Sequence, residues 1–202
     1  MELTQVVDWI GKPHLGYMIN AEFSEDNKEK LINLIQEIDQ HFNDSVFCMP
    51  KYALHITLLD WVAPLVDYGR QNKNKLYAQI KTEYDSVMSE TVSSAKSIDV
   101  HFNKIMVSPN TIYIVGEDNG EFQRIREAFV SKVKLLPNTK LPPQIIHSSL
   151  ARFIKEINLS STKDYVRTKK IDFIQKIDDF RLVRTTKEPM LEFEVLKTYK
   201  LL

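Results

Sequence analysis

The sequence predicts an α+β fold built from two related halves. Strand-like segments alternate with segments in which apolar residues recur at helical spacing. Two pairs of strand-like segments are separated by short turns, as antiparallel hairpins are. A His-x-Thr/Ser-Leu pattern occurs once in each half, at residues 55–58 and 147–150. We therefore expect a diverged duplication in which two equivalent strands face a central cleft.

The first half is expected to run strand, helix, strand, helix. Residues 15–23 are rich in apolar and aromatic side chains, and Ser24 directly after them is typical of a helix N-cap. Residues 52–59 predict the strand that carries the first motif. The apolar positions at helical spacing are Leu31, Leu34, Ile35, Ile38 and Phe42 in the first helix, and Leu76, Ile80, Tyr84 and Val87 in the second.

The second half is expected to run hairpin, helix, strand, helix, hairpin. Its segments are a hairpin of 97–107 and 111–115, a helix with Phe122, Ile125, Phe129 and Val133 on one face, a strand at 144–153, a helix from 160 to about 174, and a hairpin of 180–184 and 191–195. Asp118 or Asn119 can cap the first of these helices. No break in composition divides the chain, so we expect residues 1–202 to form a single domain of two interleaved lobes.

Each motif places an imidazole two residues before a hydroxyl. Because alternate side chains of a strand share a face, His55 and Thr57 should point the same way, as should His147 and Ser149. The bare His-x-Ser/Thr pattern would occur twice by chance roughly one time in ten, and leucine after both copies lowers this about a hundredfold. We therefore expect the two histidines to face one phosphate.

Composition narrows the classes of function. Lysine plus arginine and aspartate plus glutamate both number 27, so the net charge is zero. This argues against extended binding of duplex nucleic acid, which needs a strong positive field. Cys48 is the only cysteine, and the N-terminal segment does not resemble a signal peptide. We expect a cytoplasmic, monomeric protein that does not span a membrane.

No metal or cofactor is expected. His14, His41 and His101 lack metal-ligand spacing, and no glycine cluster resembles a phosphate-binding loop. A metal-dependent hydrolase would require carboxylates near the motifs, and Asp60 is the only one within five positions of either motif histidine.

Two histidines and two hydroxyls suit phosphodiester cleavage. One neutral imidazole can take a proton from the nucleophile, and one imidazolium can give a proton to the leaving oxygen. Each role typically contributes about 10²–10⁴-fold to the rate. Thr57 and Ser149 can donate hydrogen bonds to the phosphate oxygens. The sequence does not assign base and acid between His55 and His147.

His55-Ile-Thr57-Leu and His147-Ser-Ser149-Leu resemble the paired signature of the two-histidine (2H) phosphoesterase superfamily. The second motif there often reads His-x-Thr-Leu-x-Arg, as in the bacterial RNA 2′,3′-cyclic phosphodiesterases once named 2′–5′ RNA ligases, and Arg152 matches that arginine. The resemblance implies a bilobal α+β fold of two antiparallel sheets with outer helices and a central cleft. It also implies metal-independent catalysis by His55 and His147.

The resemblance leaves the substrate open. Members of the superfamily act on cyclic phosphates of RNA ends or of ADP-ribose, on 2′–5′ oligoadenylates, or on cyclic oligonucleotide signals. Here Ser149 replaces the usual threonine, and Asp60 and Trp61 stand where the RNA-end branch usually has an aromatic residue and a glycine. A catalytically silent nucleotide- or RNA-binding module that uses the same cleft is the alternative.

Three further residues are candidates for substrate binding. In a regular strand Arg152 points away from His147, so phosphate contact and a surface ion pair both remain open. Tyr52 and Trp61 could stack on a base, although packing in the core is the commoner role of such aromatic residues.

Overall fold

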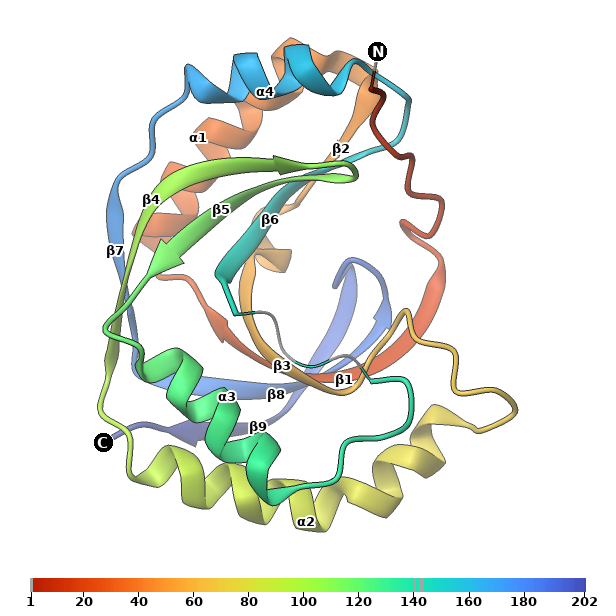
Figure 1. Ribbon diagram of the computed structural model, residues 1–202, viewed down its shortest axis with the longest axis vertical. Coiled ribbons are helices and arrows are strands. Elements are labelled where there is room, and N and C mark those ends of the chain that lie inside the picture. Colours follow the sequence, from red (N-terminus) through yellow and green to blue (C-terminus); the bar gives the residue numbers. More distant parts are fainter. Residues whose placement is uncertain (1, 140, 142–143) are drawn as a thin grey trace.

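Two antiparallel sheets face each other in the computed structural model, which describes residues 2–139, 141 and 144–202 (Figure 1). The four-stranded sheet has the order β3-β1-β8-β9, and the five-stranded sheet has the order β2-β6-β5-β4-β7. The strands are β1 (Pro13–Glu22), β2 (Val46–Cys48), β3 (His55–Val62), β4 (Ile98–Ser108), β5 (Thr111–Glu117), β6 (Ile146–Phe153), β7 (Phe173–Ile177), β8 (Asp179–Lys187) and β9 (Glu192–Lys200).

The helices cover the outer faces of the two sheets. They are α1 (Glu25–Phe42), α2 (Lys73–Ser93), α3 (Glu121–Lys132) and α4 (Leu159–Arg167), with short 3₁₀ turns at Asn43–Ser45 and Lys51–Ala53. Helices α1 and α4 lie against the five-stranded sheet, whereas α2 and α3 lie beside the four-stranded sheet (Figure 1). Because α1 follows a strand of one sheet but packs on the other, the two halves interleave.

The predicted α+β arrangement of antiparallel sheets with outer helices is confirmed. Ser24 caps α1, where its side chain accepts a hydrogen bond from the Asn27 amide. Asp118 accepts hydrogen bonds from the amides of Gly120 and Phe122 and so stabilises the start of α3. None of the helices in the described ranges is both long and apolar enough to cross a membrane.

The predicted helix from 160 to about 174 is wrong in its second half. Helix α4 ends at Arg167, and β7 begins at Phe173 and pairs with β4. Alternate residues of β7 are buried, which is the period of a strand and not of a helix. The pairing with β4, in which Phe173 lies opposite Phe102, outweighs the local helical signal.

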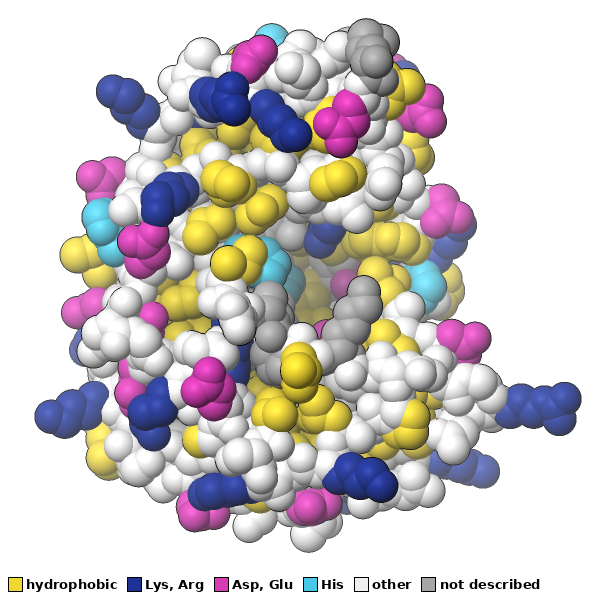
Figure 2. Space-filling model, in the orientation of Figure 1, with side chains coloured by type: hydrophobic (Ala, Val, Ile, Leu, Met, Phe, Trp, Pro, Cys, Tyr) yellow, Lys and Arg dark blue, Asp and Glu magenta, His cyan; other side chains and the backbone are white. Residues whose placement is uncertain are grey.

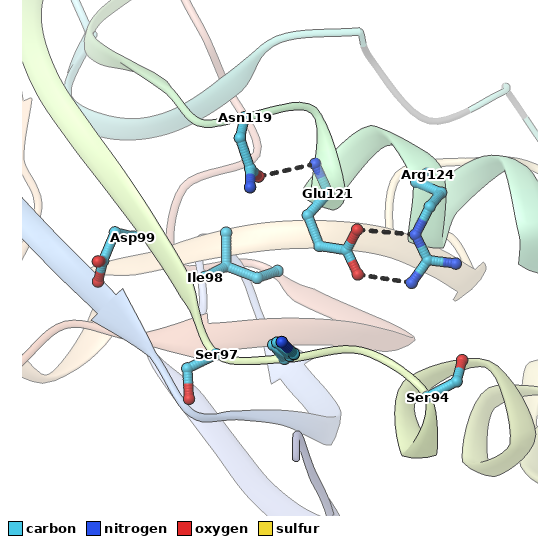
Figure 3. Close-up of a pocket in the computed structure, with 8 residues that line it drawn as sticks. Ser94, Ser97, Ile98, Asp99, Asn119, Glu121 and Arg124 are labelled. Atoms are coloured by element: carbon cyan, nitrogen blue, oxygen red, sulfur yellow. Dashed lines mark hydrogen bonds and ion pairs between the residues drawn. The ribbon is translucent and has the colours of Figure 1, made fainter.

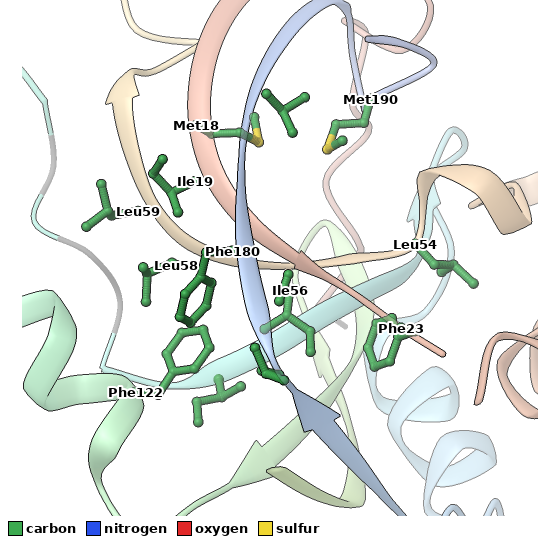
Figure 4. Close-up of a cluster of buried hydrophobic side chains, with 14 of the residues drawn as sticks. Met18, Ile19, Phe23, Leu54, Ile56, Leu58, Leu59, Phe122, Phe180 and Met190 are labelled. Carbon is green, nitrogen blue, oxygen red and sulfur yellow. The ribbon is translucent and has the colours of Figure 1, made fainter. Parts of the chain in front are cut away.

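The hydrophobic core lies behind the first motif strand. Ile56 lies between His55 and Thr57, and Leu58 follows them. Both apolar side chains are completely buried and pack in a cluster with Phe122 and Phe180 (Figure 4). Burying each such side chain stabilises the fold by about 1.5–3 kcal/mol. The core therefore fixes which face of β3 turns toward the other sheet.

Candidate active site

The two motif strands bring four polar side chains together. Strand β3 packs against β6 of the opposite sheet. His55, Thr57, His147 and Ser149 line one cavity of about 240 Å³. A second cavity of about 230 Å³ shares His147, Ser149 and Arg152 with the first. Figure 2 shows histidine side chains on the wall of a hollow in the middle of the face of the molecule that is drawn there.

Both motif strands carry a β-bulge at the leucine of the motif. Leu58 in β3 has no partner in β1, and Leu150 in β6 has no partner in β5, so each is an extra residue in its strand pair. The pairs that flank these residues are Ile19–Leu59 and Asn20–Thr57 in β3, and Ile112–Ala151 and Tyr113–Ser149 in β6. The leucine that the motifs share thus has the same structural role twice.

The bulges reverse the alternation of side chains. The residue five positions after each histidine therefore returns to the cleft face, and it is Asp60 in β3 and Arg152 in β6. The expectation from a regular strand, that Arg152 points away from His147, is wrong for this reason. Both residues line the cavity that contains the histidines.

His55 is held in one orientation by the backbone. Its Nδ1 lies 2.8 Å from the Ala53 carbonyl oxygen, which can only accept, so Nδ1 carries the proton and donates it. Nε2 is then the ring nitrogen available in the cleft. Burial lowers the pKa of His55 to about 4, while the Ala53 carbonyl opposes this shift.

His147 also favours its neutral form. Burial lowers the pKa of His147, and the charges of Arg126 and Arg152 lower it further. The ring of Tyr113 meets the imidazole edge-on, with 5.8 Å between ring centroids. An anionic phosphate between the two imidazoles would have the opposite effect and raise both pKa values, because an opposite charge nearby stabilises the imidazolium.

Arg152 connects to the hydroxyl groups of the cleft. Its Nη2 donates to Ser149 Oγ at 3.0 Å, and its Nη1 donates to Thr111 Oγ1. The guanidinium carbon lies 5.4 Å from the centre of the Trp9 ring. This arrangement puts a fixed positive charge beside the hydroxyl that is predicted to bind phosphate.

Arg126 on α3 hydrogen-bonds to the backbone of both motif segments. Its role was not predicted from the sequence. It is 1% exposed and donates to the carbonyls of Thr57 at 2.9 Å, Leu58 at 2.7 Å and Ile145 at 3.1 Å. The sequence does contain a signal: Arg126 lies four residues after Phe122, inside the apolar stripe of α3. A charged residue at a core position requires buried partners.

Two carboxylates also line the cavity. Asp60 comes from β3, and Glu188 comes from the turn between β8 and β9. Burial raises the pKa of Asp60 to about 6 and that of Glu188 to about 7. In the described part of the chain, no three His, Cys, Asp or Glu side chains are grouped so as to hold a metal ion.

The two aromatic candidates do not line the cleft cavities. Trp61 is completely buried and packs against Tyr84 and Phe129, so of the two roles left open for it the structure shows packing in the core. Tyr52 is 55% exposed and donates a hydrogen bond to the Leu191 carbonyl. Trp9 lines the cavity instead, although no sequence motif marks it as a residue of the cleft.

A larger surface hollow of about 520 Å³ lies elsewhere, between the end of α2, the start of β4 and the start of α3 (Figure 3). Its Glu121 and Arg124 side chains hydrogen-bond to each other at 2.5 and 2.7 Å. None of its lining residues is a histidine or a cysteine. The smaller cavity at the motif strands therefore remains the candidate active site because of its chemistry.

Comparison with known proteins gives matches in structure alone. No family model and no curated sequence matches the chain. TT0787 of Thermus thermophilus has a TM-score of 0.62 at 14% identity, covering 92% of this chain and 97% of its own. E. coli LigT complexed with NADP+ has a TM-score of 0.63 at 12% identity, covering 94% and 99%. A protein described as a phosphoesterase has a TM-score of 0.63 at 11% identity, also covering 94% and 99%. The chain therefore has the same fold as E. coli LigT and as the protein described as a phosphoesterase.

Proposed function

We propose that this protein is a metal-independent phosphodiesterase that acts on a cyclic or 2′-linked phosphodiester of a nucleotide or an RNA end. One observation carries the proposal: two His-x-hydroxyl pairs, from strands of different sheets, line the same cavity. E. coli LigT, which has the same fold, has been crystallised with 3′-AMP, with phosphate and with ATP. Those structures support a nucleotide as the ligand of this cleft.

The proposed reaction is an in-line displacement at phosphorus. A neutral imidazole takes a proton from the attacking water, whose oxygen bonds to phosphorus. The bond from phosphorus to a ribose oxygen breaks, and the second histidine, as imidazolium, gives that oxygen a proton. The proton count balances, and the histidines exchange protonation states. Either His55 or His147 can fill either role.

The surrounding groups supply stabilisation of charge. The hydroxyls of Thr57 and Ser149 donate to the non-bridging oxygens, and Arg152 adds a positive charge beside Ser149. The phosphate itself provides the negative charge that holds one histidine protonated inside a cavity that otherwise lowers its pKa.

The test combines a substrate panel with single substitutions. The panel contains 2′,3′-cyclic nucleotides, ADP-ribose cyclic phosphate, 2′–5′ and 3′–5′ oligoadenylates, and cyclic oligonucleotides. His55→Ala and His147→Ala should each lower kcat by about 10²–10⁴-fold on the preferred substrate, and chelator should have no effect. His101→Ala is the matched control, because His101 is an exposed residue of β4 that pairs with Asp172.

Two outcomes would contradict the proposal. Turnover at the wild-type rate in either cleft variant would exclude the two-histidine mechanism. Binding of nucleotides without turnover of any member of the panel would favour the silent binding module.

A further inference from the structure

An acidic pair lies beside the two histidines, and one of its oxygens lacks a partner. Asp60 reaches the cavity because of the bulge in β3, and Glu188 reaches it from the β8–β9 turn. Glu188 is 6% exposed, and its Oε1 has no hydrogen-bond partner among the described residues. A buried carboxylate oxygen without a partner is costly, so its position in a cavity indicates a missing donor.

The walls next to this pair are apolar. The side chains that line the same cavity beside the polar groups are Trp9, Met18, Met49, Pro64, Leu65 and Pro189. Such walls suit the flat faces of a base or the carbon skeleton of a ribose, and ligand sites commonly combine apolar walls with a few polar groups.

The charges in the cavity are unevenly divided. Arg152 lies with the histidines and hydroxyls, where a phosphate is expected. Asp60 and Glu188 are close enough to raise each other's energy when both are ionised. Lys73, a cation near both carboxylates, donates to the carbonyls of Ala63 and Pro64 at 3.0 and 2.5 Å, and the charge of Arg152 also acts on Glu188. When both carboxylates are ionised, their negative charges disfavour a second anion beside them.

We propose that Asp60 and Glu188 form an acidic subsite that accepts hydrogen bonds from an amino or hydroxyl group on the nucleoside part of the substrate. This inference rests on the proposed function, because it assumes that the phosphate lies among the histidines and hydroxyls. The subsite selects substrates whose nucleoside end carries donors and selects against a further phosphate there.

The test measures binding by calorimetry in the wild type, Asp60→Asn and Glu188→Gln. Asp179→Asn is the control, because Asp179 lies on β8 and pairs with Lys200 instead of lining the cavity. The reference probe is adenosine 3′-monophosphate. Purine riboside 3′-monophosphate lacks the amino group, 5′-deoxyadenosine 3′-monophosphate lacks the 5′-hydroxyl, and adenosine 3′,5′-bisphosphate adds a second phosphate.

Removing the donor that binds in the subsite should weaken binding about 10–100-fold in the wild type and in the control. The same change should weaken binding only about 2–10-fold in the variant of the carboxylate that accepts the bond, because a neutral amide oxygen is a weaker acceptor than a carboxylate. The analogue that shows this pattern identifies the donor as amino or hydroxyl. The bisphosphate should bind more weakly than the reference to the wild type, and Glu188→Gln should reduce that difference.

Donor deletions that act equally in the wild type and in both variants, or that have no effect, would overturn the subsite. Turnover of 2′,3′-cyclic adenosine monophosphate is measured alongside. Turnover without carboxylate-dependent binding would refute the subsite and leave the proposed function standing. Carboxylate-dependent binding without turnover of any panel member would support the subsite and refute the proposed function.

Discussion

Replacing Arg126 with methionine should destabilise the protein and misalign the two motif strands. The guanidinium donates to three buried carbonyls, of Thr57, Leu58 and Ile145, which belong to both sides of the cleft. Methionine fills much of the volume but leaves these oxygens without those donors. A buried acceptor left without its donor typically costs about 1–3 kcal/mol, so the loss of three such bonds should cost several kcal/mol in total.

The expected loss of stability is large enough to measure. In a chain of this size, about 1 kcal/mol shifts Tm by about 2–4 °C, so Arg126→Met should lower Tm by about 10 °C. Arg124→Met is the matched control on the same helix, because Arg124 is exposed and pairs with Glu121 three residues earlier. It should shift Tm by less than about 3 °C.

The same substitution should raise the pKa of His147. After burial, the charge of Arg126 is the largest cause that lowers this pKa, so removing the charge shifts it upward. Arg126→Lys retains the charge but cannot reach all three carbonyls. It should therefore leave the pKa of His147 nearly unchanged while still lowering kcat, since a misplacement of about 1 Å can cost about 10²-fold.

NMR titration of the histidine imidazoles, with His147→Ala to assign the resonance, measures this pKa without a substrate. Wild-type Tm and an unshifted His147 titration in Arg126→Met would refute the reasoning. Equal upward shifts in the Met and Lys variants would show that alignment, and not charge, controls the pKa.

Three further outcomes are expected. Because burial raises the pKa of Glu188 from 4.5 to about 7, the folded state binds this proton more tightly, and stability falls by up to about 3 kcal/mol as pH rises from 4.5 through 7. Glu188→Gln should therefore raise Tm at pH 8 but not at pH 4.5. An equal change in Tm at the two pH values would contradict the raised pKa of Glu188. Because the pKa values of His55 and His147 are lowered, binding of inorganic phosphate at pH 6 should take up protons, as calorimetry in two buffers of different ionisation enthalpy detects; zero uptake would argue against a phosphate between them. Arg152→Lys should lower kcat/KM about 10–100-fold, because lysine cannot donate to Ser149 and Thr111 at the same time. Wild-type kinetics in this variant would show that the two hydrogen bonds of the guanidinium have no role in catalysis.

The sequence predicted the motif strands because their signals are local. Apolar residues at Ile56 and Leu58 alternate with His55 and Thr57, and period-two alternation is how a strand with one buried face reads. The two-sheet architecture followed from the resemblance, which rests on the same motifs.

The rest depended on contacts that are distant in sequence. A bulge is defined by the partner strand, so the return of Asp60 and Arg152 to the cleft is not visible in one strand alone. Glu188 reaches the cavity from a turn 133 residues after His55. The sequence around Trp61 does not separate a core aromatic residue from one that faces the cleft, because its burial is produced by α2 and α3.

The paired bulges make the two sides of the cleft chemically different. A duplicated site with identical side chains would accept a phosphodiester in two opposite orientations, and each histidine would then meet the leaving oxygen in half of the encounters. The bulges bring an anion, Asp60, to one side and a cation, Arg152, to the equivalent place on the other. A substrate with unlike ends has only one favourable orientation in such a cavity. In the proposed mechanism, the residues five positions after each histidine would then determine which histidine acts as the acid and which as the base.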